Sequence, residues 1–185
     1  AGATPLITSN TFRGNTNYSI HIYSHRIKGN IYDNTYESNA QQYIHVAPST
    51  LDEDMTYVWS RDNVPYYVHS NFLVESPNNL NSIPILQIES GTTVMFNDNR
   101  NITINNTNSI NYKGAIQADG VTFMSRDSSS YSWDGIILKN YTVDSLTYFR
   151  NCTFKHAGTA ISAQGSDTEV TDNLFAYNNN AIHAD

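Results

Sequence analysis

The sequence predicts an all-β fold, a parallel β-helix, because short apolar segments repeat at fixed intervals between turn residues. Three apolar positions near the C-terminus recur at one constant interval: Phe149 as Val170, Phe154 as Phe175, and Ile161 as Ile182. Near the N-terminus, Ile20, Ile44 and Val68 are also equally spaced, at a slightly longer interval. Self-similarity at such periods is typical of solenoids. Short strands rich in β-branched residues and separated by Asn, Gly, Asp and Ser favour the β-helix among them.

Length and composition agree with this fold. The 185 residues predict a single domain, residues 1–185, of about eight coils at about 23 residues each. The chain is Asn-rich, with 24 Asn, and only 15% of its residues are charged. Asn tolerates the left-handed backbone conformation that tight turns require, and equivalent Asn side chains of stacked coils can form hydrogen-bonded ladders. The single domain is predicted to be either complete in itself or a segment or repeat unit of a longer solenoid or polymer.

The predicted elements follow one another along the chain. The first coil covers residues 7–22, the second covers 27–46, and the third ends at 67–70. An irregular excursion is expected near residues 48–62, where the pattern lapses and three consecutive acidic residues occur. Apolar runs typical of strands then return at residues 72–75, 85–89, 93–96, 102–104, 115–118, 121–123 and 132–138.

Four segments carry a resemblance to a known superfamily: residues 64–68, 86–96, 115–123 and 133–137. They resemble segments of secreted bacterial and archaeal right-handed parallel β-helix proteins, the pectate-lyase-like superfamily. The resemblance implies a right-handed β-helix that is secreted or exposed at the cell surface. It implies no single activity, because the superfamily includes pectate lyases, polygalacturonases, tailspikes, adhesins and surface-layer components.

Charge and hydropathy exclude two classes of partner. The net charge of −7, with ten Lys and Arg, provides no basic patch, which argues against nucleic acid. No apolar run approaches the length of about 18 residues that a membrane-spanning helix needs, so no transmembrane segment is expected. The chain starts at Ala1 without an initiator Met or a signal peptide, which we interpret as a mature secreted product or an excised segment.

No set of residues stands out as catalytic. Of the polygalacturonase motifs, only residues 26–28 (Arg-Ile-Lys) are present. Glycoside hydrolysis requires two carboxyl groups held about 5–10 Å apart. The adjacent acidic residues 52–54 lie in the irregular excursion, and we interpret them as a solvated or capping cluster instead. The Arg–Asp pairs are equally unspecific: Arg61 with Asp62, Arg100 with Asp98, and Arg126 with Asp127.

A non-enzymatic role is therefore favoured, and a glycan-binding or glycan-cleaving module, lyase-like or hydrolase-like, is the alternative. In that alternative, Tyr18, Tyr43 and Tyr67 would stack on sugar rings.

Histidines recur in register with the predicted coils. His21, His45 and His69 each follow an inward apolar residue at equal intervals, and His183 follows Ile182 in the same way. Such an outward row could bind a transition metal or act as an acid-sensitive seam. The simpler interpretation is a polar row that duplicated coils produce, because no carboxylate completes a ligand set. No cofactor is expected beyond this metal option, or a calcium ion as in pectate lyases.

Two further features are a single cysteine and a set of glycosylation sequons. Cys152 is the only cysteine, and it is predicted to occupy the inward or ladder position that Asn10, Asn30 and Asn173 hold in other coils. Five sequons would permit glycosylation, at Asn17, Asn101, Asn105, Asn140 and Asn151.

The two ends of the repeat predict self-association. Solenoids usually carry a polar cap or an amphipathic helix at each end, and neither end of this repeat shows one. If a second copy followed Asp185, the interval from Val170 to the next Ile7 would match the internal period, and so would the interval from Ile182 to the next Ile20. We therefore predict a structural extracellular protein that stacks head to tail into a filament, sheath or tube, with contacts at Ile7, Phe12, Ile20, Val170, Phe175 and Ile182.

Overall fold

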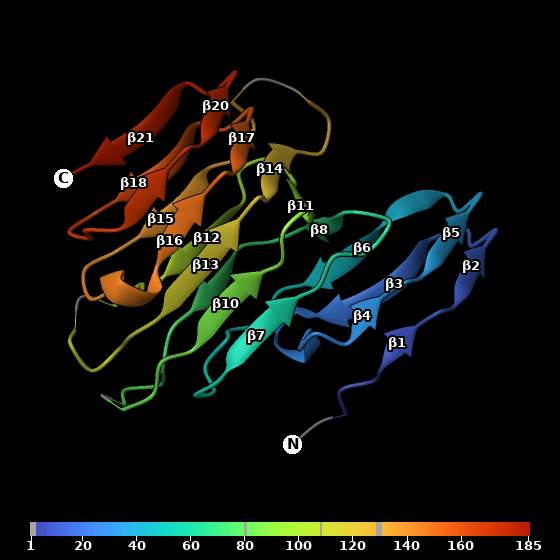
Figure 1. Cartoon of the computed structure of the whole chain (residues 1–185), viewed down its shortest axis with the longest axis horizontal. Helices are drawn as coiled ribbons and strands as arrows, with labels where there is room; N and C mark the ends of the chain where they lie inside the picture. Colours follow the sequence, from blue (N-terminus) through green and yellow to red (C-terminus); the bar gives the residue numbers. More distant parts are fainter. Residues whose placement is uncertain (1–2, 80, 108, 129–130) are drawn as a thin grey trace.

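The computed structural model describes residues 3–79, 81–107, 109–128 and 131–185, and it confirms the parallel β-helix. Within these residues 21 strands follow one another, and every pairing between them is parallel. Three strands make one coil, so that coil 1 contains β1 to β3 and coil 7 contains β19 to β21. The coils succeed one another along the long axis of the molecule, with the last coil and the C-terminus at one end and β2 and β5 of the first two coils at the other (Figure 1).

Three sheets form the faces of the β-helix. The β7 sheet contains β7 (Thr56–Trp59), β10 (Ile85–Ile88), β13 (Ala115–Asp119), β16 (Tyr148–Arg150) and β19 (Glu169–Thr171). The seven-stranded sheet contains β3 (Tyr18–Tyr23), β6 (Gln41–Ala47), β8 (Tyr66–Val68), β11 (Thr93–Phe96), β14 (Thr122–Ser125), β17 (Thr153–Lys155) and β20 (Leu174–Ala176). The β9 sheet contains β9 (Phe72–Val74), β12 (Asn101–Ile104), β15 (Gly135–Leu138), β18 (Thr159–Ala163) and β21 (Asn180–Ala184).

Two smaller sheets complete coils 1 and 2. They pair β1 (Ile7–Thr8) with β4 (Ile31–Tyr32), and β2 (Thr11–Arg13) with β5 (Thr35–Glu37). The only helices in the described residues are two single 3₁₀ turns, η1 (Ser24–Arg26) and η2 (Asp144–Leu146). None of the described segments forms a helix long and apolar enough to span a bilayer.

The core fills the space inside the coils because side chains alternate along each strand. In β11, Val94 and Phe96 are fully buried, whereas Thr93 and Met95 between them are only half-buried. The repeat of the C-terminal coils is confirmed, since Phe154 pairs with Phe175 and Ile161 with Ile182. Each inward side chain thus lies over the equivalent side chain of the preceding coil.

Seven coils rather than about eight are present in the described residues, because the central coils are longer than predicted. Ile7 of the first coil pairs with Ile31, whereas the partner of Leu86, Ile116, lies clearly further along the chain. The additional residues lie in loops between strands, such as residues 105–107 and 109–114 between β12 and β13. Outward loops of this kind lengthen a coil without disturbing the stacked strands.

The irregular excursion predicted near residues 48–62 is shorter than expected. Residues 52–55 have no strand structure, but β7 lies inside the predicted range and starts the β7 sheet. Tyr57 and Trp59 of this strand are fully buried. Their alternation with Thr56 and Val58 is an ordinary strand pattern that the preceding acidic residues obscured.

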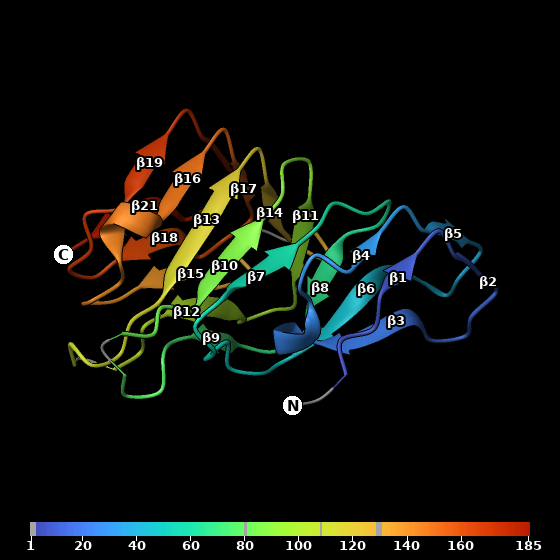
Figure 2. The same ribbon diagram turned by 60° about the horizontal axis from the view of Figure 1, so that its bottom comes forward.

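The pairing of equivalent strands changes between coils 2 and 3. β6 is the third strand of coil 2, yet it pairs with β8, the second strand of coil 3. Ile44 therefore lies opposite Tyr66, and Val68 lies opposite Val46, which corrects the predicted alignment of Ile44 with Val68. β3 and β6 extend the seven-stranded sheet, while β1, β2, β4 and β5 form the two small sheets at this end of the molecule (Figure 2).

Candidate functional site: the two end coils

The C-terminal coil exposes an apolar edge. Its strands β19, β20 and β21 pair on one side only, with β16, β17 and β18. Val170 and Phe175 are half-buried, and Ile182 remains 46% exposed. Ile182, which the sequence places at an inward position, is therefore not buried in this chain, because no described coil covers its outer side.

The N-terminal coil exposes the opposite edge. β1 and β2 pair only with β4 and β5, which leaves their outer sides without a partner strand in the described residues. Ile7 and Phe12 are half-buried, whereas Ile20 is only 6% exposed. The six residues predicted to mediate assembly thus lie in the two end coils, and five of them retain accessible surface there.

Both end coils are built from the same turns. In coil 1 the backbone takes a positive φ at Ser9 (57°) and Gly14 (64°). In coil 7 it does so at Asp172 (54°) and Tyr177 (59°). Each of these residues directly precedes an Asn, and three of the four have a short polar side chain or none, which favours this left-handed conformation. The two coils therefore have a left-handed residue at the same two places, directly before an Asn.

The predicted histidine row is only partly formed. His21 and His45 lie opposite each other, and their rings stack with centroids 4.6 Å apart and planes 14° apart. His69 lies diagonally, 5.4 Å from His45, because the backbone partner of His45 is Tyr67. His183 does not belong to the row, since it lies in the β9 sheet opposite Ser162, with its Nε2 3.2 Å from the Asp185 carboxylate.

Stacked imidazoles present their faces rather than their nitrogen lone pairs to one another, which is a poor arrangement for ligands of one metal ion. In the part of the chain that the structure describes, no group of three or more His, Cys, Asp or Glu is placed to hold a metal ion.

His45 is the unusual member of the row. It is only 6% exposed, and its Nδ1 has no hydrogen-bond partner among the described residues. Burial, reinforced by the neighbouring His21 and His69, lowers the pKa of His45 to about 4. The ring therefore stays neutral at neutral pH and behaves as a packed aromatic group, stacked on Tyr18 at 4.1 Å.

The tyrosines predicted to stack on sugar rings are engaged elsewhere. Tyr43 and Tyr67 are 7% and 2% exposed, with ring centroids 4.5 Å apart. The guanidinium of Arg126 lies over the Tyr67 ring and donates a hydrogen bond to its hydroxyl at 3.1 Å. Only Tyr18 retains accessible surface, so these three residues do not form an open platform for a glycan.

Two of the Arg–Asp pairs considered in the sequence have structural partners. Asp62 accepts hydrogen bonds from the main-chain N–H and the side-chain amide of Asn34, both at 3.0 Å, and from the Tyr36 hydroxyl at 2.7 Å. Its carboxylate is therefore a structural group that links coil 3 to coil 2. Asp127 pairs with its own neighbour Arg126 at 2.8 Å, and this pairing lowers the pKa of Asp127.

The predicted glycosylation sites differ in accessibility. Asn17, Asn140 and Asn151 are exposed, and Asn101 is half-buried. Asn105 is fully buried, and its amide donates to the Asn140 carbonyl oxygen at 2.5 Å. Asn105 is therefore unsuited to carry a glycan in the folded chain, a correction that the sequon alone could not provide.

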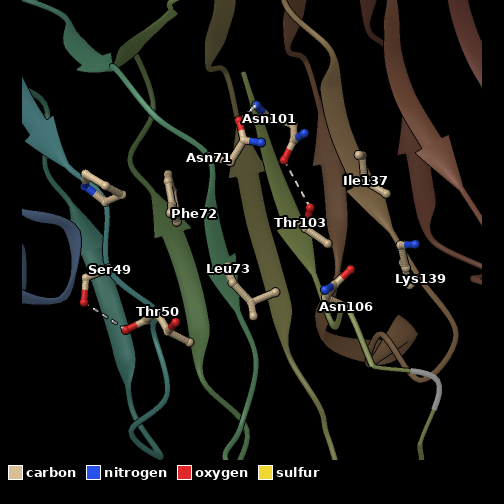
Figure 3. A pocket seen from close by; sticks show the side chains of 11 residues that line it. Ser49, Thr50, Asn71, Phe72, Leu73, Asn101, Thr103, Asn106, Ile137 and Lys139 are labelled. Carbon is tan, nitrogen blue, oxygen red and sulfur yellow. Dashed lines mark hydrogen bonds between the residues drawn. The ribbon is translucent and has the colours of Figure 1, made fainter. Parts of the chain in front are cut away.

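A shallow groove of about 550 Å³ lies along the outside of the β9 sheet (Figure 3). Hydroxyl and amide groups dominate its walls, including Asn71, Asn101 and Thr103, and Lys139 provides an amine. No carboxylate is found among the described residues that line it. It has hydrogen-bonding groups but neither an acid pair nor an exposed aromatic face, so it does not favour glycan cleavage.

The chain was compared with protein-family models, with curated proteins and with solved structures. No family model matches it, and neither comparison with individual proteins or structures found a match.

Proposed function

We propose that this chain is a structural β-helix module that stacks its end coils head to tail on further copies. The observation that carries the proposal is the pair of open end coils. The C-terminal coil presents three strand edges together with Val170, Phe175 and Ile182, and the N-terminal coil presents edges beside Ile7 and Phe12. Stacking would pair the exposed backbone groups and bury both apolar ends, and exposed strand edges readily pair with another chain.

The proposed contact is heterologous, because a C-terminal surface meets an N-terminal one. A heterologous contact propagates into a filament or tube unless its rotation closes a ring. The groove beside the β9 sheet has no carboxylate among its described lining residues, which supports a structural role over glycan cleavage. The proposal retains the secreted or cell-surface location that the sequence predicts.

Sedimentation velocity and electron microscopy of the purified chain over a wide concentration range test this function. The wild-type chain should form species that grow with concentration. Ile182→Asp should block this growth while leaving the β-sheet circular dichroism signal unchanged, because it places a charge in the contact and not in the buried core. Ala176→Asp is the matched control, since Ala176 belongs to the same coil and lies opposite Lys155 on the outer face. A wild-type chain that stays monomeric at every concentration would contradict the proposal.

A further inference from the structure

Asparagine side chains connect coil 2 to coil 1 in a repeated geometry. The Asn34 Oδ1 accepts the main-chain N–H of Asn10 at 3.1 Å, and its Nδ2 donates to the carbonyl of Ile7 at 3.0 Å. We call this pair of contacts an amide bridge. It joins an Asn to the main-chain N–H of the equivalent residue in the preceding coil. The same Asn also contacts the carbonyl of the residue three positions before that equivalent residue. Asn39 forms a second amide bridge in the next turn, to the N–H of Asn15 at 3.0 Å and the carbonyl of Phe12 at 2.9 Å.

The same two bridges connect coil 7 to coil 6. Asn173 accepts the N–H of Cys152 at 2.7 Å and donates to the carbonyl of Phe149 at 2.8 Å. Asn178 accepts the N–H of Ala157 at 2.8 Å and donates to the carbonyl of Phe154 at 3.0 Å. The two ends of the molecule thus use one contact geometry, although the coils between them are longer.

Every amide bridge points toward the coil that precedes it in the chain. A residue with positive φ directly precedes each of these Asn, as at Asp33 (57°) and Asp172 (54°). The two Asn side chains of coil 1 have no preceding coil among the described residues. Asn10 and Asn15 are exposed, and their Nδ2 groups contact Asn34 and Asn39 of the following coil instead.

Coil 7 carries the complementary groups. By register, the groups that would receive bridges from a following coil are the N–H of Asn173 and the carbonyl of Val170 in one turn. In the next turn they are the N–H of Asn178 and the carbonyl of Phe175. No described coil lies on that side of β19, β20 and β21.

Resting on the proposed head-to-tail stacking, we propose that Asn10 and Asn15 form amide bridges to the last coil of a second copy of this chain. Asn10 accepts the N–H of the second copy's Asn173 and donates to its Val170 carbonyl. Asn15 does the same with Asn178 and Phe175. A second copy is the occupant because its end coil has the same turns, the same spacing and the same arrangement of donors and acceptors as the internal coil junctions.

The aromatic stacks continue across the same junction. Phe154 and Phe175 stack at 5.0 Å, and Phe12 and Tyr36 stack at 5.3 Å. The amide bridges place Phe12 of one copy over Phe175 of the other, which joins the two stacks into one. Stacked aromatic pairs contribute beyond the area that they bury.

The bridges also determine polarity and register. Because the amides point in one direction only, they permit head-to-tail contacts and provide nothing for head-to-head pairing. In this register β21 continues into β3 of the next copy, yet β3 belongs to the seven-stranded sheet and β21 to the β9 sheet. One sheet of each copy therefore passes into a different sheet of the next, and successive copies are rotated about the common axis.

Disulfide trapping tests the register. Neighbouring strands bring paired Cα atoms to about 4.8 Å, which is within disulfide range. Chains that carry Thr11→Cys with Leu174→Cys, or Thr8→Cys with Thr171→Cys, should form covalent multimers on mild oxidation. The swapped combinations, Thr8→Cys with Leu174→Cys and Thr11→Cys with Thr171→Cys, should not, because a turn separates those positions. Cys152 is 1% exposed and remains as background in every variant.

Removal of the amides tests the bridges themselves. Asn10→Ala with Asn15→Ala should raise the concentration needed for assembly about 30-fold or more, because four interfacial hydrogen bonds are lost. The matched control is Asn17→Ala, an exposed Asn of the same coil outside both bridges, which should assemble like the wild type.

The outcomes separate the two proposals. If the wild type assembles and the double Ala variant assembles equally well, the amide bridges are overturned and head-to-tail stacking is left intact. The same conclusion follows if the swapped cysteine pairs cross-link. A wild type that never associates overturns both. Cross-linking of the two in-register pairs together with impaired assembly of the double variant is the result that we expect.

Discussion

Phe154 and Phe175 stack face to face, with ring centroids 5.0 Å apart and planes inclined by 9°, although a whole coil of sequence separates them. Phe123 continues the stack on the other side of Phe154 at 4.9 Å. Each ring belongs to a different coil, so the contact between neighbouring coils is the unit that stabilises the core. A coil has no apolar interior of its own, and its stability depends on its neighbours.

The position of a ring in this stack determines what its loss costs. Phe154→Ala should lower the free energy of unfolding by about 3–5 kcal/mol, because the ring is fully buried between two others. Phe175→Ala should cost clearly less, since Phe175 is half-buried in the last coil. Urea denaturation followed by circular dichroism measures both variants. Equal losses in the two would show that the end coil is as well packed as the interior.

The glycine that begins β15 should be irreplaceable. Gly135 has a φ of 99°, and a Cβ at this position would clash with the carbonyl oxygen of Thr159. Gly135→Ala should therefore cost about 2–4 kcal/mol, through backbone strain and a displaced strand. Gly14 is the matched control, because it has a φ of 64° but no atom within 4 Å of the added Cβ.

Gly14→Ala should lose only about 1 kcal/mol, from the left-handed backbone conformation alone. Thermal unfolding of both variants decides the comparison. If Gly135→Ala were no worse than Gly14→Ala, the close approach to Thr159 would not constrain the fold.

The seam of His21, His45 and His69 predicts a loss of stability in mild acid. Burial lowers the folded-state pKa of His45 to about 4, whereas unfolded histidine titrates near 6.5. The unfolded chain therefore binds a proton that the folded chain does not bind between these pH values. Stability must fall as the pH drops from about 6.5 toward 4, by about 1–3 kcal/mol from this group.

The measurement is the free energy of unfolding against pH for the wild type and for His45→Gln. Carboxylates also contribute to acid unfolding, so the difference between the two profiles carries the information. The variant should show a flatter profile between pH 6.5 and 4. Parallel profiles would mean that His45 is not kept neutral by the fold.

Much of this fold could be predicted from the sequence, because coil stacking repeats chemistry at a fixed period. The pairings of Phe154 with Phe175 and of His21 with His45 follow directly from equal spacing. The equal spacing of His69 predicted the wrong partner for His45. The change of strand pairing between coils 2 and 3 depends on how two coils of different shape fit together, which the spacing does not record. The burial of Tyr43 and Tyr67 likewise arises from contacts between strands and with Arg126, which no local pattern records.

The end coils were visible in the sequence, but their hydrogen bonds were not. The interval from Ile7 to Phe12 equals that from Val170 to Phe175, which indicates equivalent positions. The amide bridges appear only once the turn conformation is known. Asn30 was predicted to share the position of Asn10, and the structure places Asn34 there instead, bonded to Asn10. Asn30 donates to the carbonyl of Pro5, outside the repeated turn.

Cys152 provides the last prediction, because it replaces asparagine in the series of amide bridges. Its sulfur lies 3.5 Å from the carbonyl oxygen of Ala118, where a bridging amide would donate, and the main-chain N–H of Val121 also contacts it. Burial raises the pKa of the thiol, so it should remain protonated and react with thiol reagents only after unfolding.

Cys152→Asn should add a full amide bridge to coil 5 and raise the free energy of unfolding by about 0.5–1.5 kcal/mol. Cys152→Ala should lower it by about 1–3 kcal/mol, since the Val121 N–H then loses its contact. Urea denaturation of the three chains should rank them Asn above Cys above Ala. An Asn variant less stable than the wild type would show that coil 6 cannot accommodate the bridge that coils 2 and 7 share.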